Sequence, residues 1–203
     1  MKYFHEKATP DNLDAYVKDI IEKNSDIKVL LRLEQISDET TYYHSLDVAV
    51  IANKMLTAYE EAYNKPGLFN EIREDIIKGA LLHDIGKVFI PLGLMLSPKK
   101  FTSEEKDIAN LHTTLGGVIL DGLFSQIVTD ITMYHHNPYL LISEDERKTA
   151  MIYIIYVADI FEALISARPY KQAYPVDSAL GHMENDDIPS NYLSLLKTTL
   201  NES

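Results

Sequence analysis

The sequence contains no cysteine among its 203 residues. Disulfide bonds and thiolate metal sites are therefore excluded, and a cytoplasmic location is the default expectation. The first residues, MKYFHEKATP, lack a basic stretch followed by an apolar core, so we expect no signal peptide. The longest apolar run, residues 150–165, is interrupted by Asp159 and Glu162. It is too short and too charged to span a membrane, so no membrane association is predicted.

Positive charge is also scarce. The chain has 19 Lys and Arg residues against 31 Asp and Glu residues, which gives a formal net charge of −12. Such a surface repels the phosphate backbone, so DNA or RNA binding is not expected. An anionic substrate would bind only where metal ions or a local group of cations reverse the field. The balance of 46% hydrophobic and 25% charged residues is that of an ordinary globular protein, and the length suits one domain.

No segment alternates polar and apolar residues convincingly, so no β-strand is predicted. The apolar residues instead recur with a helical period, first in the stripe over 13–21. A capping box, Thr102-x-x-Glu105, predicts where one later helix begins. Residues 88–101 lack a period and carry prolines and a glycine, which favours a loop. The prediction is an all-α fold, a compact multi-helix bundle, with further helices over 29–36, 40–63, 71–85 (ended by Gly86), 124–136, 148–165, 175–184 and 190–201.

Several metal-ligating side chains fall on the apolar faces of these predicted helices. One histidine on such a face is most often a hydrogen-bonded core residue. Asp159 is different, because an ionised carboxylate buried in YIIYVADIFEALI costs several kcal/mol unless a cation compensates it. No Lys or Arg lies within one turn of Asp159, so a metal ion is a natural partner. The full set comprises His44, His83, Asp84, His112, His135, His136 and Asp159.

Imidazole and carboxylate ligands fit zinc, manganese or iron. Seven candidate ligands exceed the need of a single ion, which indicates a two-metal site. Asp84 is the obvious bridge, because a carboxylate has two oxygens to share. Two ions roughly 3.5–4 Å apart suit the hydrolysis of phosphate esters.

The order H…HD…H…HH…D resembles that of HD-domain metal-dependent phosphohydrolases. The segments HDIGKVFIP, FTSEE, LHTTLGGVIL, HH and YVADIFEALISARPYK are similar to the HD-GYP subfamily over roughly residues 40–200. Residues 1–36 match no pattern we identify. We expect them to form an N-terminal helical extension packed on the core of an HD-GYP-like domain over 37–203. A helical cap, a homodimer surface and the remnant of a sensory module all stay open for this extension.

The resemblance implies a phosphodiesterase acting on a cyclic dinucleotide, usually cyclic di-GMP, or a related nucleotide, in which a metal-bridging water or hydroxide attacks phosphorus. Lys87 would bind a substrate phosphate, with help from Arg168 and Lys171, and Asp84 and Lys87 would be the catalytic residues. Iron is the first candidate for the two divalent ions, with manganese and zinc as alternatives. The resemblance implies one ion held by His44, His83, Asp84 and Asp159 and a second by Asp84, His112, His135 and His136.

Two departures from the subfamily pattern matter. The sequence from the paired histidines onward is HHNPYLLISEDERKT. Asn137 therefore replaces the usual Glu, and the GYP tripeptide is absent. Some members hold a third metal through a Glu one turn before the first histidine. That place is Thr40 here, and Glu39 would point about 100° away on an α-helix, so we expect two metals.

Two other functions remain open at this point. Some HD-domain proteins are di-iron oxygenases with similar ligands, although Lys87, Arg168 and Lys171 favour a phosphate substrate. A catalytically silent signalling module is the other alternative. The intact ligand set argues against it, because a chain that needed only packing would fill these faces with Leu or Ile.

Overall fold

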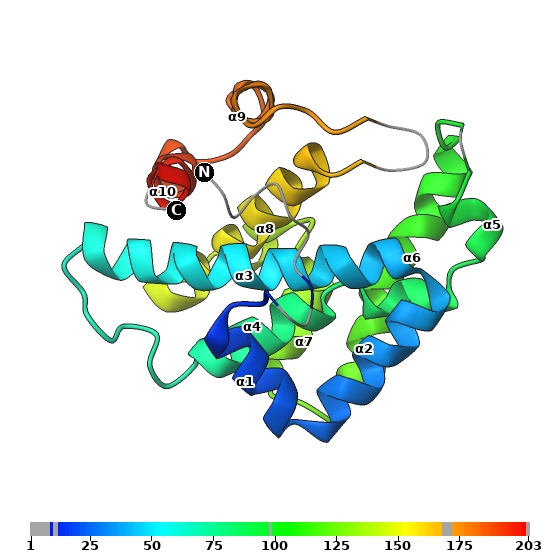
Figure 1. The fold of residues 1–203 in the computed structure, drawn as a ribbon, viewed down its shortest axis with the longest axis horizontal. Coiled ribbons are helices and arrows are strands. Elements are labelled where there is room, and N and C mark those ends of the chain that lie inside the picture. Colours follow the sequence, from blue (N-terminus) through cyan, green and yellow to red (C-terminus); the bar gives the residue numbers. More distant parts are fainter. Residues whose placement is uncertain (1–8, 10–11, 98, 168–171, 202–203) are drawn as a thin grey trace.

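The computed structural model describes residues 9, 12–97, 99–167 and 172–201. These described residues form helices and no strand, which confirms the predicted all-α fold (Figure 1). The α-helices are α1 (Ala15–Lys23), α2 (Ser25–Ser37), α3 (Glu39–Ala62), α4 (Arg73–Leu82), α5 (Leu92–Met95), α6 (Ser103–Leu120), α7 (Gln126–Tyr134), α8 (Glu146–Ile165), α9 (Val176–Met183) and α10 (Ser190–Asn201), and the 3-10 helices are η1 (Ile85–Phe89) and η2 (Pro138–Leu141).

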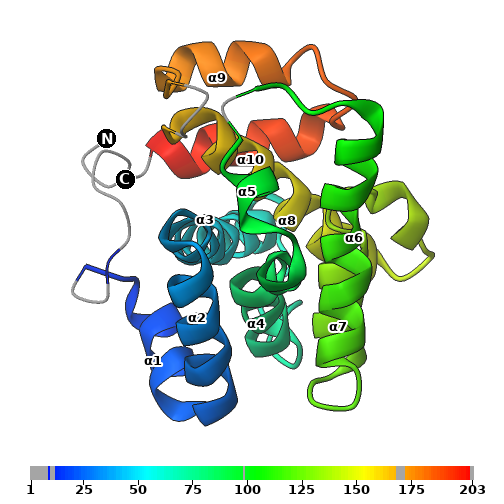
Figure 2. The ribbon, with the colours of Figure 1, turned by 90° about the vertical axis from the view of Figure 1, so that its right-hand side faces the viewer.

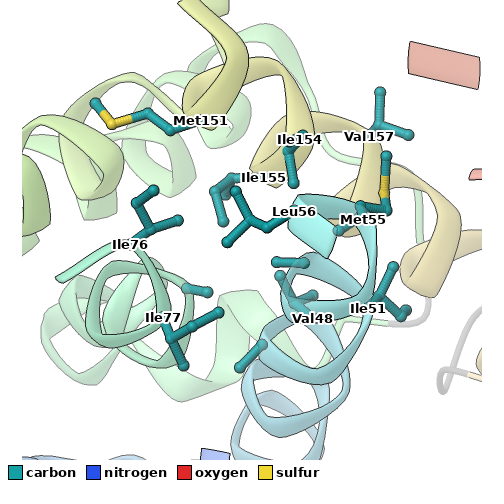
Figure 3. Close-up of a cluster of buried hydrophobic side chains, with 14 of the residues drawn as sticks. Val48, Ile51, Met55, Leu56, Ile76, Ile77, Met151, Ile154, Ile155 and Val157 are labelled. Carbon is teal, nitrogen blue, oxygen red and sulfur yellow. The ribbon is translucent and has the colours of Figure 1, made fainter. Parts of the chain in front are cut away.

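The long helix α3 lies at the centre of the bundle. It packs against α2 and α4 on one side and against α8 and α10 on the other (Figures 1 and 2). Apolar residues recur on α3 at helical spacing, so most of its length is buried. The core forms where α3, α4 and α8 meet (Figure 3), around Val48, Ile51, Met55, Leu56, Ile76, Ile77, Met151, Ile154, Ile155 and Val157.

Helices α1 and α2 lie side by side below α3 (Figures 1 and 2). Asp14 caps α1, because its carboxylate accepts hydrogen bonds from the backbone N–H groups of Tyr16 and Val17. Both helices contribute buried apolar side chains to the same core cluster as α3, including Val17 and Leu31. Helix α2 also packs against η1, so this N-terminal segment reaches the chain around Lys87.

The end of α4 differs from the expected helix over 71–85. Helix α4 ends at Leu82, His83 and Asp84 lie in the turn that follows, and Gly86 belongs to η1 instead of ending α4. A Cβ atom at Gly86 would lie 1.9 Å from the carbonyl oxygen of His112. Gly86 is therefore required by the close approach of η1 to α6, and this approach brings His112 towards His83 and Asp84.

Other boundaries follow the sequence more closely. Helix α6 begins with the predicted capping box, in which Thr102 and Glu105 each accept the other's backbone N–H. The predicted loop over 88–101 is not wholly irregular, because it holds the end of η1 and the short helix α5. None of the helices in the described part of the chain combines the length and the apolar character that a membrane crossing requires.

The close contact at Gly86 generates a stability prediction. Gly86→Ala should overpack the junction of η1 and α6 and cost about 1–3 kcal/mol, which lowers Tm by several °C in a chain of this size. Gly181→Ala in α9 is the control, because nothing lies within 4 Å of its Cβ position. It should leave Tm unchanged or raise it, since Ala favours a helix interior by roughly 0.5–1 kcal/mol over Gly. Equal Tm values for Gly86→Ala and the parent protein would contradict the packing argument.

Candidate metal centre

Side chains from five helical segments converge at one end of the core. The structure brings together all seven side chains that the sequence singles out: His44 from α3, His83 and Asp84 from the turn after α4, His112 from α6, His135 and His136 from the end of α7, and Asp159 from α8. Their potential ligand atoms form three groups, each within 4.8 Å: His44, His83 and Asp159; His83, Asp84 and His135; and His112, His135 and His136.

Asp84 lies between the group of His44, His83 and Asp159 and the group of His112, His135 and His136. One of its oxygens, Oδ2, lies 3.5 Å from His83 Nε2, and the other, Oδ1, lies 3.3 Å from His112 Nε2. Within the group that contains His44, the Nε2 atom of His44 is 3.1 Å from Asp159 Oδ1 and 3.2 Å from His83 Nε2. Each oxygen of Asp84 therefore faces a different group, which is the geometry that a bridging carboxylate needs.

Three of the histidines are oriented by the backbone. In each, Nδ1 hydrogen-bonds to the carbonyl oxygen three residues earlier, and a carbonyl can only accept. The proton of the neutral ring therefore sits on Nδ1, and the Nε2 lone pair faces the cluster. The Nδ1···O distances are 2.8 Å from His83 to Ala80, 2.6 Å from His112 to Ala109 and 2.9 Å from His135 to Thr132.

His44 is oriented by a side chain that the sequence analysis missed. Its Nδ1 hydrogen-bonds to Oε2 of Glu162, which is only 3% exposed, and Ser166 donates its hydroxyl to Oε1 of Glu162. A carboxylate behind a histidine is a common outer support of metal-binding imidazoles. The available signal was that Glu162 interrupts an apolar run one helical turn after Asp159.

The buried carboxyl groups stay ionised because of their neighbours. Burial alone would raise the pKa of Asp84, but the ammonium of Lys87 and the imidazole of His83 hold that pKa well below its usual range. Burial would also raise the pKa of Asp159. The hydrogen bond and the charge of His44 outweigh this effect and lower the pKa of Asp159 below its usual range. The centre therefore holds two anionic side chains at neutral pH.

The histidines divide into two kinds. Burial opposes protonation of His44, yet the carboxylates of Glu162 and Asp159 raise its pKa to about 10. Burial lowers the pKa of His83 to about 4 and that of His135 well below its usual value. Near neutral pH, His83 and His135 are therefore neutral and have lone pairs available for a cation.

This donor set fits divalent metal ions. Asp84 Oδ1 is buried and has no hydrogen-bond partner among the described residues, which is costly unless a cation or a proton donor approaches it. The Nε2 atoms of His112 and His135 lie 3.3 and 3.8 Å from Oδ1, and that of His83 lies 3.5 Å from Oδ2. Imidazole nitrogen and carboxylate oxygen are the ligands that zinc, manganese and iron accept.

Of the three residues predicted to bind substrate, the structure describes only Lys87. Lys87 lies in η1 and donates a hydrogen bond to Asp84 Oδ2, and its side chain is 16% exposed. Arg168 and Lys171 lie outside the described residues. His136 lies at the edge of the centre, where its side chain is 41% exposed and its Nδ1 is 3.6 Å from Asp159 Oδ2. The cluster thus has a closed side around His44 and an open side at His136.

Comparisons with known proteins agree with this architecture. The sequence profile of the HD domain matches residues 41–164, which is more than half of the chain. The HD domain of the phosphodiesterase PgpH from L. monocytogenes has a similar fold, with a TM-score of 0.55 and 20% sequence identity over 84% of this chain and 94% of that one. The chain therefore belongs to the HD-domain family.

Relatives with known roles are longer proteins. The "cyclic di-GMP phosphodiesterase response regulator RpfG" of Xanthomonas campestris pv. campestris is 37% identical over 58% of this chain and 33% of its own length. The "cyclic di-GMP phosphodiesterase PA4108" of Pseudomonas aeruginosa is 31% identical over 85% of this chain and 42% of its own length. The chain thus spans less than half the length of these relatives.

The position of Asp84 leads to a prediction about metal content. The purified protein should bind about two transition-metal ions per chain. Asp84→Asn should lower the occupancy of both, because one carboxylate oxygen faces each group. His112→Ala should empty mainly one. Elemental analysis of folded protein, verified by circular dichroism, measures this, and a full complement in Asp84→Asn would contradict the bridging role.

A second prediction concerns Glu162. Glu162→Gln should weaken metal binding about tenfold, the low end of the usual effect of an outer-support substitution. Glu146→Gln is the matched control on the same helix α8, because Glu146 instead contacts Tyr59 and Lys65. Titration with a competing chelator measures both affinities. If the two variants bind metal equally well, the contact of Glu162 with His44 does not contribute to metal affinity.

Proposed function

We propose that this chain is a metal-dependent phosphodiesterase that hydrolyses a cyclic dinucleotide, with cyclic di-GMP as the first candidate. The observation that carries the proposal is the convergence of five histidines and Asp159 on the two sides of Asp84. The names of the relatives described above support the substrate class. Because the chain spans less than half of each relative, its own substrate must be measured directly.

The metal ligands follow from the grouping. One ion would be held by His44, His83, Asp84 and Asp159, and the second by Asp84, His112, His135 and His136. Iron is the first candidate, with manganese and zinc as alternatives. When bound, such a pair neutralises charge on a phosphate and supplies a nucleophile at neutral pH.

The remaining chemistry belongs to side chains of this chain. Lys87 is suited to hold a phosphate oxygen, since a protonated amine donates hydrogen bonds but has no lone pair with which to compete for metal. Arg168 and Lys171 are proposed to assist it. These cations matter because the chain carries a net charge of −12, so an anionic substrate needs a local reversal of the field.

A turnover screen tests the proposal. Protein loaded with Fe²⁺, Mn²⁺ or Zn²⁺ is mixed with cyclic di-GMP, other cyclic dinucleotides and linear pGpG, and products are separated by chromatography. We expect hydrolysis of at least one cyclic dinucleotide by the parent protein and none by metal-depleted Asp84→Asn. Protein with two ions per chain that hydrolyses none of these nucleotides would refute the proposal, and oxygen consumption would then be the reaction to test.

The same assay gives a kinetic prediction for Lys87. Lys87→Ala should retain metal but lose a charge-assisted contact of about 1.5–3 kcal/mol, which is roughly tenfold or more in kcat/KM. Lys106→Ala, on the exposed face of α6, is the control and should match the parent. Parental kcat/KM in a metal-replete Lys87→Ala variant would contradict the phosphate contact.

A further inference from the structure

Glu34 is a buried acid with no assigned role. It lies on α2, is 1% exposed, and neither carboxylate oxygen makes a well-formed hydrogen bond within the described part of the chain. Burial, followed by the nearby charge of Asp84, raises its pKa to about 8. Natural proteins rarely leave a buried carboxyl unpaired, because it has lost its hydration without gaining a partner. The position therefore points to a partner that Glu34 does not contact in this structure.

Lys87 lies beside the same space. Glu34 and Lys87 line one small cavity, of about 10 Å³, together with Asp38 and Thr41. The packing of α2 against η1 brings the two side chains to this cavity. The charge of Lys87 already acts on Glu34 by lowering its pKa against the effect of burial. Lys87 thus lies near two acids, Asp84 and Glu34, and among the described residues its hydrogen bond is to Asp84.

Metal ions and Lys87 would compete for the same oxygen of Asp84. Lys87 donates to Asp84 Oδ2, the oxygen that faces His83. Cations at both oxygens of Asp84 would compete with Lys87 for Oδ2 and repel its ammonium. Because the Lys87 side chain is mostly buried, the displaced ammonium needs another anion.

Of the two acids that line the cavity, Glu34 is the one available, and an approaching ammonium favours the ionised form of its carboxyl group. Asp38 is already engaged as the cap of α3, since its oxygens accept hydrogen bonds from the backbone N–H of Thr40 at 3.0 Å and the hydroxyl of Thr41 at 2.7 Å. Neither oxygen of Glu34 accepts such a bond from a residue that the structure describes.

We propose that Glu34 is the second anchor of Lys87: when metal ions occupy Asp84, the ammonium crosses the shared cavity and pairs with the Glu34 carboxylate. The inference rests on the metal centre of the proposed function. Glu34 is then a positioning residue that acts through Lys87 and keeps the ammonium beside the metal ions, where a substrate phosphate would lie. Helix α2, which precedes the matched HD-domain segment, thereby contributes to the site.

A double-mutant cycle in metal affinity tests this pairing. Mn²⁺ affinity and stoichiometry are measured by chelator competition and elemental analysis for the parent, Glu34→Gln, Lys87→Met and the double variant. Glu34→Gln should bind Mn²⁺ about tenfold more weakly, because the displaced ammonium loses a charge-assisted partner. In the Lys87→Met background the same substitution should have no effect on affinity. Thermal melting without metal should show that Glu34→Gln is at least as stable as the parent, since a buried acid has been removed.

Asp38→Asn is the matched control from the same cavity. It should leave the Mn²⁺ affinity unchanged and change Tm by the same small amount with and without Mn²⁺, because asparagine caps a helix about as well as aspartate. Three results would overturn the inference: parental affinity in Glu34→Gln, an affinity loss in Asp38→Asn alone, or the loss of one whole metal equivalent in Glu34→Gln, which would make Glu34 a ligand. A parent protein that binds no metal refutes the metal centre itself, which is a distinct failure.

A crystal structure of the Mn²⁺-loaded parent decides the matter even if Glu34→Gln does not fold. Lys87 Nζ within hydrogen-bond distance of the Glu34 carboxylate supports the inference, whereas Lys87 still bonded to Asp84 overturns it.

Discussion

The site depends on the compensation of buried negative charge. Asp84 and Asp159 are almost completely removed from solvent inside the helical bundle, where an isolated carboxylate is unstable. In this structure Lys87 compensates Asp84 and His44 compensates Asp159. The protein therefore supplies cations of its own that a metal pair would replace. This arrangement allows the bundle to bury a dense set of candidate ligands.

Much of this arrangement was predictable from the sequence because helical period reports which face a residue occupies. His44 and Asp159 lie on apolar stripes of α3 and α8, and both helices formed close to their predicted ranges. Burial of a polar side chain on such a stripe is a local property of the sequence. The convergence of the seven side chains could therefore be expected from the helix faces of His44, His112 and Asp159 together with the resemblance to HD-domain proteins.

The contacts that the sequence did not predict are those between distant segments. Glu162 supports His44 across 118 positions of the chain, and Glu34 approaches Lys87 only because α2 packs on η1. Gly86 was interpreted as a helix end because a glycine often has that role, whereas the structure uses its missing side chain for contact with α6. In each case the deciding neighbour lies in another helix, and no local pattern encodes it.

The unequal burial of the two ligand groups has a consequence for the kinetics of metal exchange. His44, His83 and Asp159 are all buried, whereas the group of His112, His135 and His136 includes a side chain that meets solvent. An ion on the open side can dissociate from the folded protein, but one on the closed side must wait for a local opening of the helices around it. A metal pair in this site would thus have one ion that exchanges slowly and one that equilibrates with the ions in solution, and this difference in burial alone would produce mixed pairs.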